Sequence, residues 1–101
     1  MNTQTLISEA KARFNHNLAK QYLKDKYQVK LIVANQGGLW KASPELMVFL
    51  DNEGSEELVL LDLYENPIKV NRPQLASTIR DTYNSVMQDW YNEWSILEKK
   101  R

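Results

Sequence analysis

This sequence contains no cysteine and only one histidine among its 101 residues. Without cysteine, the chain can form neither disulfides nor thiolate metal sites, and a reducing compartment is permitted. The single histidine, His16, has no partner of the kind that metal centres and acid–base sites need, so we expect it at the surface. The sequence also lacks a G-x-S-x-G motif and a phosphate-binding loop. We therefore expect no enzyme activity, no metal and no cofactor.

Glycine and proline are also scarce, with three of each, and no apolar run is long enough to cross a bilayer. The first five residues do not resemble a signal peptide. We therefore expect a cytoplasmic protein that does not bind membranes. A chain of this length that is 43% apolar can build one core. The sequence thus predicts a single domain over residues 1–101.

Charge of either sign is unevenly spread, although 13 basic and 13 acidic residues balance. Residues 11–41 hold seven basic groups against Asp25 alone, and residues 51–65 hold six acidic groups with no basic one. Two interpretations stay open: two solvated faces, or a positive surface that meets a negative surface on a neighbouring copy, which favours head-to-tail assembly. The neutral total argues against strong non-specific DNA binding.

The most clearly marked element is a long C-terminal helix over Arg72–Leu97. Asn71 suits its N-cap and Pro73 its first turn. Its apolar residues recur every three or four positions, as in a helix with one buried face: Leu75, Ile79, Tyr83, Val86, Trp90, Trp94 and Leu97. We expect Ile79, Tyr83 and Val86 in the core, and Trp94 and Leu97 against a neighbouring subunit or another protein.

An N-terminal helix is predicted over Thr5–Lys24. A narrow apolar face with a spacing of four supports it: Leu6, Ala10, Phe14, Leu18 and Tyr22. From Tyr27 the apolar residues alternate up to Ala34, which is typical of a strand. The turn residues Asn35–Gly38 and a second short strand, Leu39–Ala42, complete a predicted hairpin over Tyr27–Ala42.

The middle of the chain predicts more strands. Ser43–Leu50 is ambiguous: we favour one helical turn at 44–47 that passes into an extended segment, but a buried strand fits as well. Asp51–Glu56 reads as a solvated loop, and Glu57–Tyr64 as a central strand that is apolar on both faces except at Asp62. Ile68–Val70 is the next strand. The fold class is therefore α+β, with four or five bent antiparallel strands in a small sheet or open barrel between two helices.

Aromatic residues beside basic ones suggest two kinds of surface. Trp40 with Lys41, and Tyr27 with Lys30, could stack on and pair with single-stranded RNA, or could simply belong to the core and the strand edges. A late aromatic cluster on the last helix is typical of an oligomer interface. With the acidic Glu57 and with Leu97, that cluster gives the candidate interface residues: Glu57, Trp90, Tyr91, Trp94 and Leu97.

Three segments, Lys30–Trp40, Glu65–Arg72 and Tyr83–Trp90, resemble a small protein of cyanobacterial bacteriophages and marine environmental sequences. The likeness covers nearly the whole chain. That group is similar in fold to the Sm/LSm proteins, RNA-binding small barrels of the Sm or SH3 kind that assemble into rings. In those proteins an N-terminal helix precedes five bent strands, and residues of two loops bind RNA around the pore.

The resemblance implies RNA-binding residues in two loops. Asp51–Asn52 is a loose counterpart of the first loop motif, and Asn71–Arg72 of the second, in which Pro73 replaces the expected glycine. The long final helix lies outside the family plan. Together with the aromatic–basic pairs, the candidate RNA-binding residues are Lys30, Trp40, Lys41, Asp51, Asn52, Asn71 and Arg72.

Two functions follow from these expectations. The first is a phage-derived, ring-forming Sm-like protein that binds RNA or assists RNA processing in the infected host cell. The second is a phage structural or assembly protein that acts through protein–protein contacts and binds no nucleic acid. Both include a homo-oligomer, so oligomeric state alone does not separate them.

Overall fold

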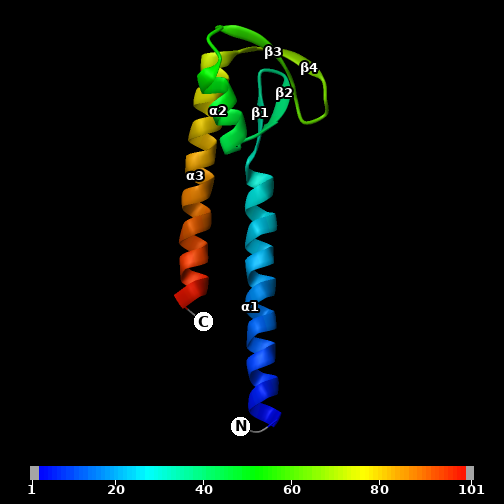
Figure 1. The fold of residues 1–101 in the computed structure, drawn as a ribbon, viewed down its shortest axis with the longest axis vertical. Helices are drawn as coiled ribbons and strands as arrows, with labels where there is room; N and C mark the ends of the chain where they lie inside the picture. Colours follow the sequence, from blue (N-terminus) through cyan, green and yellow to red (C-terminus); the bar gives the residue numbers. More distant parts are fainter. Residues whose placement is uncertain (1–2, 100–101) are drawn as a thin grey trace.

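The computed structural model describes residues 3–99 and shows a long stalk with a head at one end (Figure 1). The molecule measures 65 × 24 × 19 Å. The stalk consists of two antiparallel helices, α1 (Thr3–Lys30) and α3 (Arg72–Lys99), that lie side by side. The head holds helix α2 (Pro44–Asn52) and two β-hairpins. The fold class is α+β, as predicted.

Helix α1 is longer than predicted, because residues 27–30 continue the helix instead of opening a strand. Its buried residues in this part are Leu23, Tyr27 and Leu31, the last directly after the helix. Their spacing of four is helical, whereas Val29, which supported the alternating pattern, is 69% exposed. The strand predicted from Tyr27 is therefore wrong in its first half.

The first hairpin pairs β1 (Ile32–Asn35) with β2 (Gly38–Lys41). Asn35 lies opposite Gly38, so Gln36 and Gly37 form the two-residue loop. Both have positive φ, 52° and 84°, as a type I′ turn requires, and this turn matches the twist of the strands. The predicted turn at Asn35–Gly38 is confirmed.

Helix α2 forms the whole of the segment that the sequence left ambiguous. The Ser43 side chain caps it by accepting a hydrogen bond from the Leu46 amide at 3.2 Å, and Pro44 occupies the first turn. Leu46, Met47 and Leu50 then face the core at helical spacing. The extended segment predicted after residue 47 is wrong, since the helix continues to Asn52.

The second hairpin pairs β3 (Glu57–Leu61) with β4 (Pro67–Asn71). The predicted central position of this strand is wrong, because within residues 3–99 β3 pairs with β4 alone. Leu58 and Leu60 pack toward the core, while Val59 and Leu61 point outward and are more than half exposed. Both faces of β3 are therefore apolar. The face with Leu58 and Leu60 packs on the core, and the face with Val59 and Leu61 is exposed.

The two hairpins remain separate two-stranded sheets and do not close into the expected small barrel. Backbone and side-chain hydrogen bonds link the two hairpins. The Leu63 amide donates to the Leu39 carbonyl at 2.9 Å. At the first turn, the Gln36 side chain accepts from the Asn71 amide at 2.6 Å and donates to the Asn71 carbonyl at 3.2 Å. A side-chain amide therefore supplies the hydrogen bonds that a neighbouring strand would supply in a barrel.

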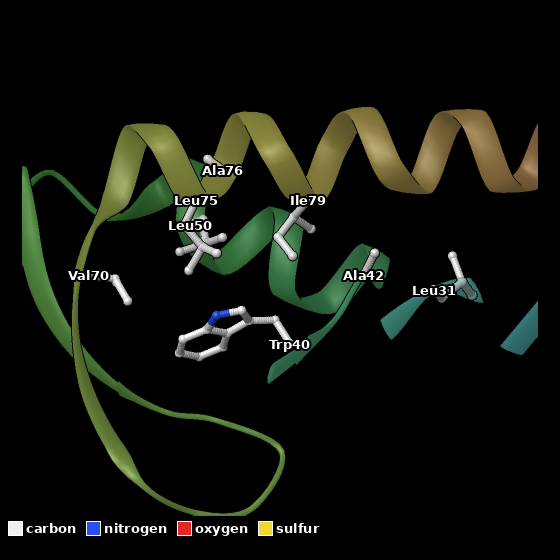
Figure 2. Packing of buried hydrophobic residues seen from close by; sticks show 8 residues of the cluster. All are labelled: Leu31, Trp40, Ala42, Leu50, Val70, Leu75, Ala76 and Ile79. Carbon is white, nitrogen blue, oxygen red and sulfur yellow. The ribbon is translucent and has the colours of Figure 1, made fainter. Parts of the chain in front are cut away.

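Helix α3 starts where predicted, with the Asn71 side chain accepting from the Gln74 amide at 3.0 Å. Leu75, Ala76 and Ile79 on its first turns pack against α2 and both hairpins, around the indole of Trp40 (Figure 2). Ile79 is fully buried, and Tyr83 and Val86 are partly buried against this cluster, which agrees with the sequence prediction. Eight buried residues make up the cluster: Leu31, Trp40, Ala42, Leu50, Val70, Leu75, Ala76 and Ile79.

The position of Trp40 depends on Gly38. A Cβ atom at residue 38 would lie 2.8 Å from Cζ2 of the indole, closer than carbon atoms approach. We expect Gly38→Ala to push the indole aside and break its 2.9 Å hydrogen bond to the Asn35 carbonyl, at a cost of about 1–3 kcal/mol in the free energy of unfolding. Urea denaturation measures this loss.

Gly54→Ala is the matched control for this change, because nothing lies within 4 Å of the added carbon and its backbone does not need positive φ. Its unfolding free energy should equal that of the wild type or rise slightly. Equal stability of the Gly38→Ala protein would show that the indole can move without cost and would contradict this account of the core.

Candidate functional site

The candidate RNA-binding residues lie in two separate places. Lys30 lies at the end of α1, with Nζ 5.0 Å from the centre of the Tyr27 ring. Trp40 is only 3% exposed, and its indole N–H donates to the Asn35 carbonyl, while its neighbour Lys41 is exposed. A base could stack on Trp40 only if the core opened.

The other four candidates gather where α2 ends and α3 begins. Arg72 donates to the carbonyls of Ser55 at 2.6 Å and Leu50 at 3.0 Å. Asp51 forms an ion pair with Arg80, and Asn52 is exposed. Asn71 caps α3, as described above. Apart from Asn52, these side chains already hold the head together.

Asp62 connects the two hairpins through its carboxylate. It accepts hydrogen bonds from the amides of Asn66 at 3.0 Å, Leu39 at 3.2 Å and Tyr64 at 2.9 Å. These donors, that of Asn66 first, hold the pKa of the carboxyl below its ordinary value, although burial alone would raise it. An acid among apolar residues could have a raised pKa, but at Asp62 the backbone donors outweigh the effect of burial. The carboxylate has a structural role here.

Contacts between α1 and α3 form the middle of the stalk. The rings of Tyr27 and Trp90 stack, with centroids 5.8 Å apart and an angle of 10° between the planes. Glu93 accepts hydrogen bonds from Lys26 at 2.7 Å and from the Tyr27 hydroxyl. These bonds, that of Lys26 first, lower the pKa of Glu93, and the bond to Glu93 raises the pKa of both Lys26 and Tyr27.

The candidate interface residues have different surroundings. Trp90 stacks within its own chain, and Glu57 lies 3.3 Å from Lys69 on the paired strand. Leu97 is partly buried and borders a hollow between the helices. Tyr91 and Trp94, with ring centroids 6.1 Å apart, are 60% and 40% exposed. Helix α1 thus reaches the part of α3 where the sequence predicted a neighbouring subunit or another protein.

The apolar stripe predicted as the buried face of the first helix is exposed instead. Phe14, Leu18 and Tyr22 are 64%, 54% and 67% exposed. At 3.6 residues per turn, Phe14 and Leu18 lie on the side of α1 away from Leu23 and Tyr27, which are the residues that face α3. We call the exposed set the stalk face; it consists of Leu6, Ile7, Ala10, Phe14, Leu18 and Tyr22.

The first turns of α1 extend beyond the end of α3 (Figure 1). Near the C-terminal end of α3, Glu98 lies 3.2 Å from His16. His16 itself is partly buried, contrary to the surface position expected. The sequence contained a signal for this arrangement, since Leu23, Tyr27 and Leu31 form a second apolar stripe out of line with the first. Only one of the two stripes can face α3.

A second exposed apolar region lies on the β3–β4 hairpin. Val59 and Leu61 share the outward face of β3, and Leu63 and Tyr64 lie in the following turn. Their exposure runs from 46% for Leu63 to 72% for Tyr64. We call these four residues the hairpin surface. In Figure 1 this hairpin lies at the head, and the N-terminal half of α1 lies at the other end of the long axis.

Comparisons of the chain with protein-family models, with curated proteins and with solved structures found no match. The phage and Sm-like resemblance is therefore a prediction from sequence alone. Within residues 3–99, no helix is both long enough and apolar enough to cross a bilayer. In the same residues, no three His, Asp or Glu side chains gather in a way that could hold a metal ion.

The ion pair at Glu93 predicts a pH dependence. The folded pKa of Glu93 lies below the ordinary value of about 4.3, so its contribution to stability is complete above that pH and is lost as the pH falls through the folded pKa. We expect the unfolding free energy of the wild type to fall more between about pH 5 and pH 3 than that of Glu93→Gln. Urea denaturation at constant ionic strength measures both.

Glu9→Gln is the control, because Glu9 is exposed on the first turns of α1. It should lose stability on acidification in parallel with the wild type. The pKa values of Lys26 and Tyr27 are raised, so the stability that these two groups contribute is lost only above about pH 10. Neither group therefore affects the change in stability between pH 5 and pH 3. Parallel curves for wild type and Glu93→Gln would contradict a role for this pair in holding α1 to α3.

Proposed function

We propose that this chain is a non-enzymatic assembly protein that acts through contacts with other proteins along its stalk. The observation that supports this proposal most is the stalk face. Contiguous apolar patches of a few hundred Å² on a soluble protein are often interaction sites. Six apolar residues spread over more than four turns of one helix form a patch of this kind.

The free energy that burial of the stalk face would release favours its role as an interface. Burying a large apolar side chain contributes about 1.5–3 kcal/mol, so each half-exposed one would contribute on the order of 1 kcal/mol when covered. Leu6, Ile7, Phe14, Leu18 and Tyr22 together would then contribute roughly 5 kcal/mol, which is useful against the cost of association. An amphipathic helix that lies against an apolar surface is a common mode of protein recognition.

RNA binding is the second candidate function, and the basic residues of α1 favour it. Lys11, Arg13, Lys20 and Lys24 are exposed on the same helix as Phe14 and Tyr22. Cations beside aromatic rings suit single-stranded nucleic acid. The more specific proposal of a ring-forming, Sm-like RNA-binding protein is supported by the sequence resemblance. The fold does not add to that support, because the two hairpins do not form a barrel.

A photo-crosslinking residue separates the two functions. Placed at Leu18 in the full chain and activated in cells that carry the chain's natural partners, it should form an adduct with protein. The same residue at Asn84, an exposed polar position on α3, is the matched control and should give no specific adduct. An adduct of the Leu18 probe with RNA would contradict the proposal.

Filter binding to short single-stranded RNA gives an independent measurement. We expect no retention of RNA at low salt, because the charge of the whole chain is zero and the aromatic Trp40 is buried. Retention that weakens steeply with salt, and is lost in a Lys20→Glu, Lys24→Glu protein, would favour the RNA-binding function instead.

A further inference from the structure

We propose that the stalk face of one copy docks on the hairpin surface of a second copy, so that the chain assembles head to tail. This inference rests on the proposed function and names its partner. Both surfaces are apolar and exposed, and the N-terminal half of α1, which holds most of the stalk face, lies at the opposite end of the 65 Å molecule from the hairpin (Figure 1). Within one chain they therefore cannot meet.

The unpaired charges beside the stalk face are mainly positive, with Glu9 and Asp25 as the two exposed acids of the helix. Arg13, Lys20 and Lys24 follow one another at spacings of seven and four, so they lie on one line along α1, between the stalk face and α3. Lys11 lies within the stalk face. All four are exposed, and within residues 3–99 none of them forms an ion pair. A partner that covers this face would therefore meet positive charges that no acidic residue of the stalk's own chain neutralises.

The unpaired charges beside the hairpin surface are negative. Asp51 forms an ion pair with Arg80, and Glu57 forms one with Lys69. The Asp62 carboxylate accepts hydrogen bonds from backbone amides. The three remaining acids of residues 51–65 form no ion pair within the described part of the chain: Glu53, Glu56 and Glu65. The charges left over on the two surfaces are therefore opposite in sign, which favours their contact and sets its orientation.

The dimensions of the two surfaces also agree. From Leu6 to Tyr22 the stalk face is about 24 Å long at 1.5 Å per residue. The five residues of β3 span about 17 Å at 3.4 Å per residue, and the turn with Leu63 and Tyr64 adds to this length. A helix laid along the hairpin would cover most of both apolar sets.

A symmetric pairing of α1 with α1 of another copy is less favourable. The described helix carries six basic residues and only two acidic ones, Glu9 and Asp25. Two such helices face to face would place like charges beside one another, which is destabilising. Docking on the acidic hairpin avoids this repulsion. Because such an interface joins different surfaces, it leads to a ring if the rotation closes and to a filament if it does not.

Mixing two variants tests this interface directly. The stalk variant carries Phe14→Ser and Leu18→Ser, and the hairpin variant carries Val59→Thr and Leu61→Thr, which keep a high strand propensity. All four positions are exposed, so circular dichroism and thermal melting should match the wild type. Val48→Thr changes an exposed apolar residue of α2 and is the matched control that should assemble like the wild type.

In sedimentation velocity at tens of micromolar, the wild type should form closed or open oligomers larger than a dimer. Each variant alone should associate at least tenfold more weakly. An equimolar mixture should form a 1:1 heterodimer and nothing larger, because only the hairpin variant's stalk face and the stalk variant's hairpin surface are intact. Reversing Lys20 and Lys24 to Glu should weaken assembly, and adding Glu56→Lys and Glu65→Lys should restore part of it.

Three results of the sedimentation experiment would overturn the inference. The first is a wild type that stays monomeric at this concentration. The second is a hairpin variant that still assembles alone, which would indicate stalk-to-stalk pairing. The third is a mixture without heterodimer. An adduct of the Leu18 probe with a different protein would overturn this inference and leave the proposed function standing, whereas an RNA adduct would overturn both.

Discussion

The shape of this molecule depends on the stacking of Tyr27 on Trp90, which joins the end of α1 to the middle of α3. An aromatic pair of this kind contributes about 0.5–1.5 kcal/mol beyond the burial of its rings. Lys26 and Glu93 add an ion pair beside it. Because Leu31 follows directly and belongs to the core of the head, the same contact sets the direction in which α1 leaves the head. The described residues N-terminal to about His16 then extend past the end of α3.

This arrangement explains why one helix carries two apolar stripes. The short second stripe, Leu23, Tyr27 and Leu31, is buried and builds the stalk and its junction with the head. The longer first stripe is exposed, and up to Leu18 it lies on the side of α1 away from α3, while Tyr22 borders the hollow beside Leu97. The β3–β4 hairpin repeats the pattern, with Leu58 and Leu60 inside and Val59 and Leu61 outside. A helix and a strand that each leave an apolar face exposed support the proposal that a partner covers them.

Local signals in the sequence predicted the structure well where hydrogen bonds are made between near neighbours. The cap at Asn71, the turn at Asn35–Gly38 and the cap at Ser43 are of this kind. Prediction failed where tertiary contacts decide. Alternation at 27–33 matched a strand, but the packing of Tyr27 on Trp90 favours the helix. Sequence could likewise list the apolar residues of the stalk face, but not which of two stripes α3 would cover.

Hydrogen exchange read by mass spectrometry at two protein concentrations tests the central claim, that the stalk face is open in the single chain and closed by a second copy. In dilute solution, amides of residues 3–15 should exchange much faster than those of residues 19–30, since a helix without tertiary contacts opens readily. At high concentration, residues 6–22 and 57–65 should gain protection together. Protection of residues 3–15 already in dilute solution, or a gain confined to α1, would contradict the account.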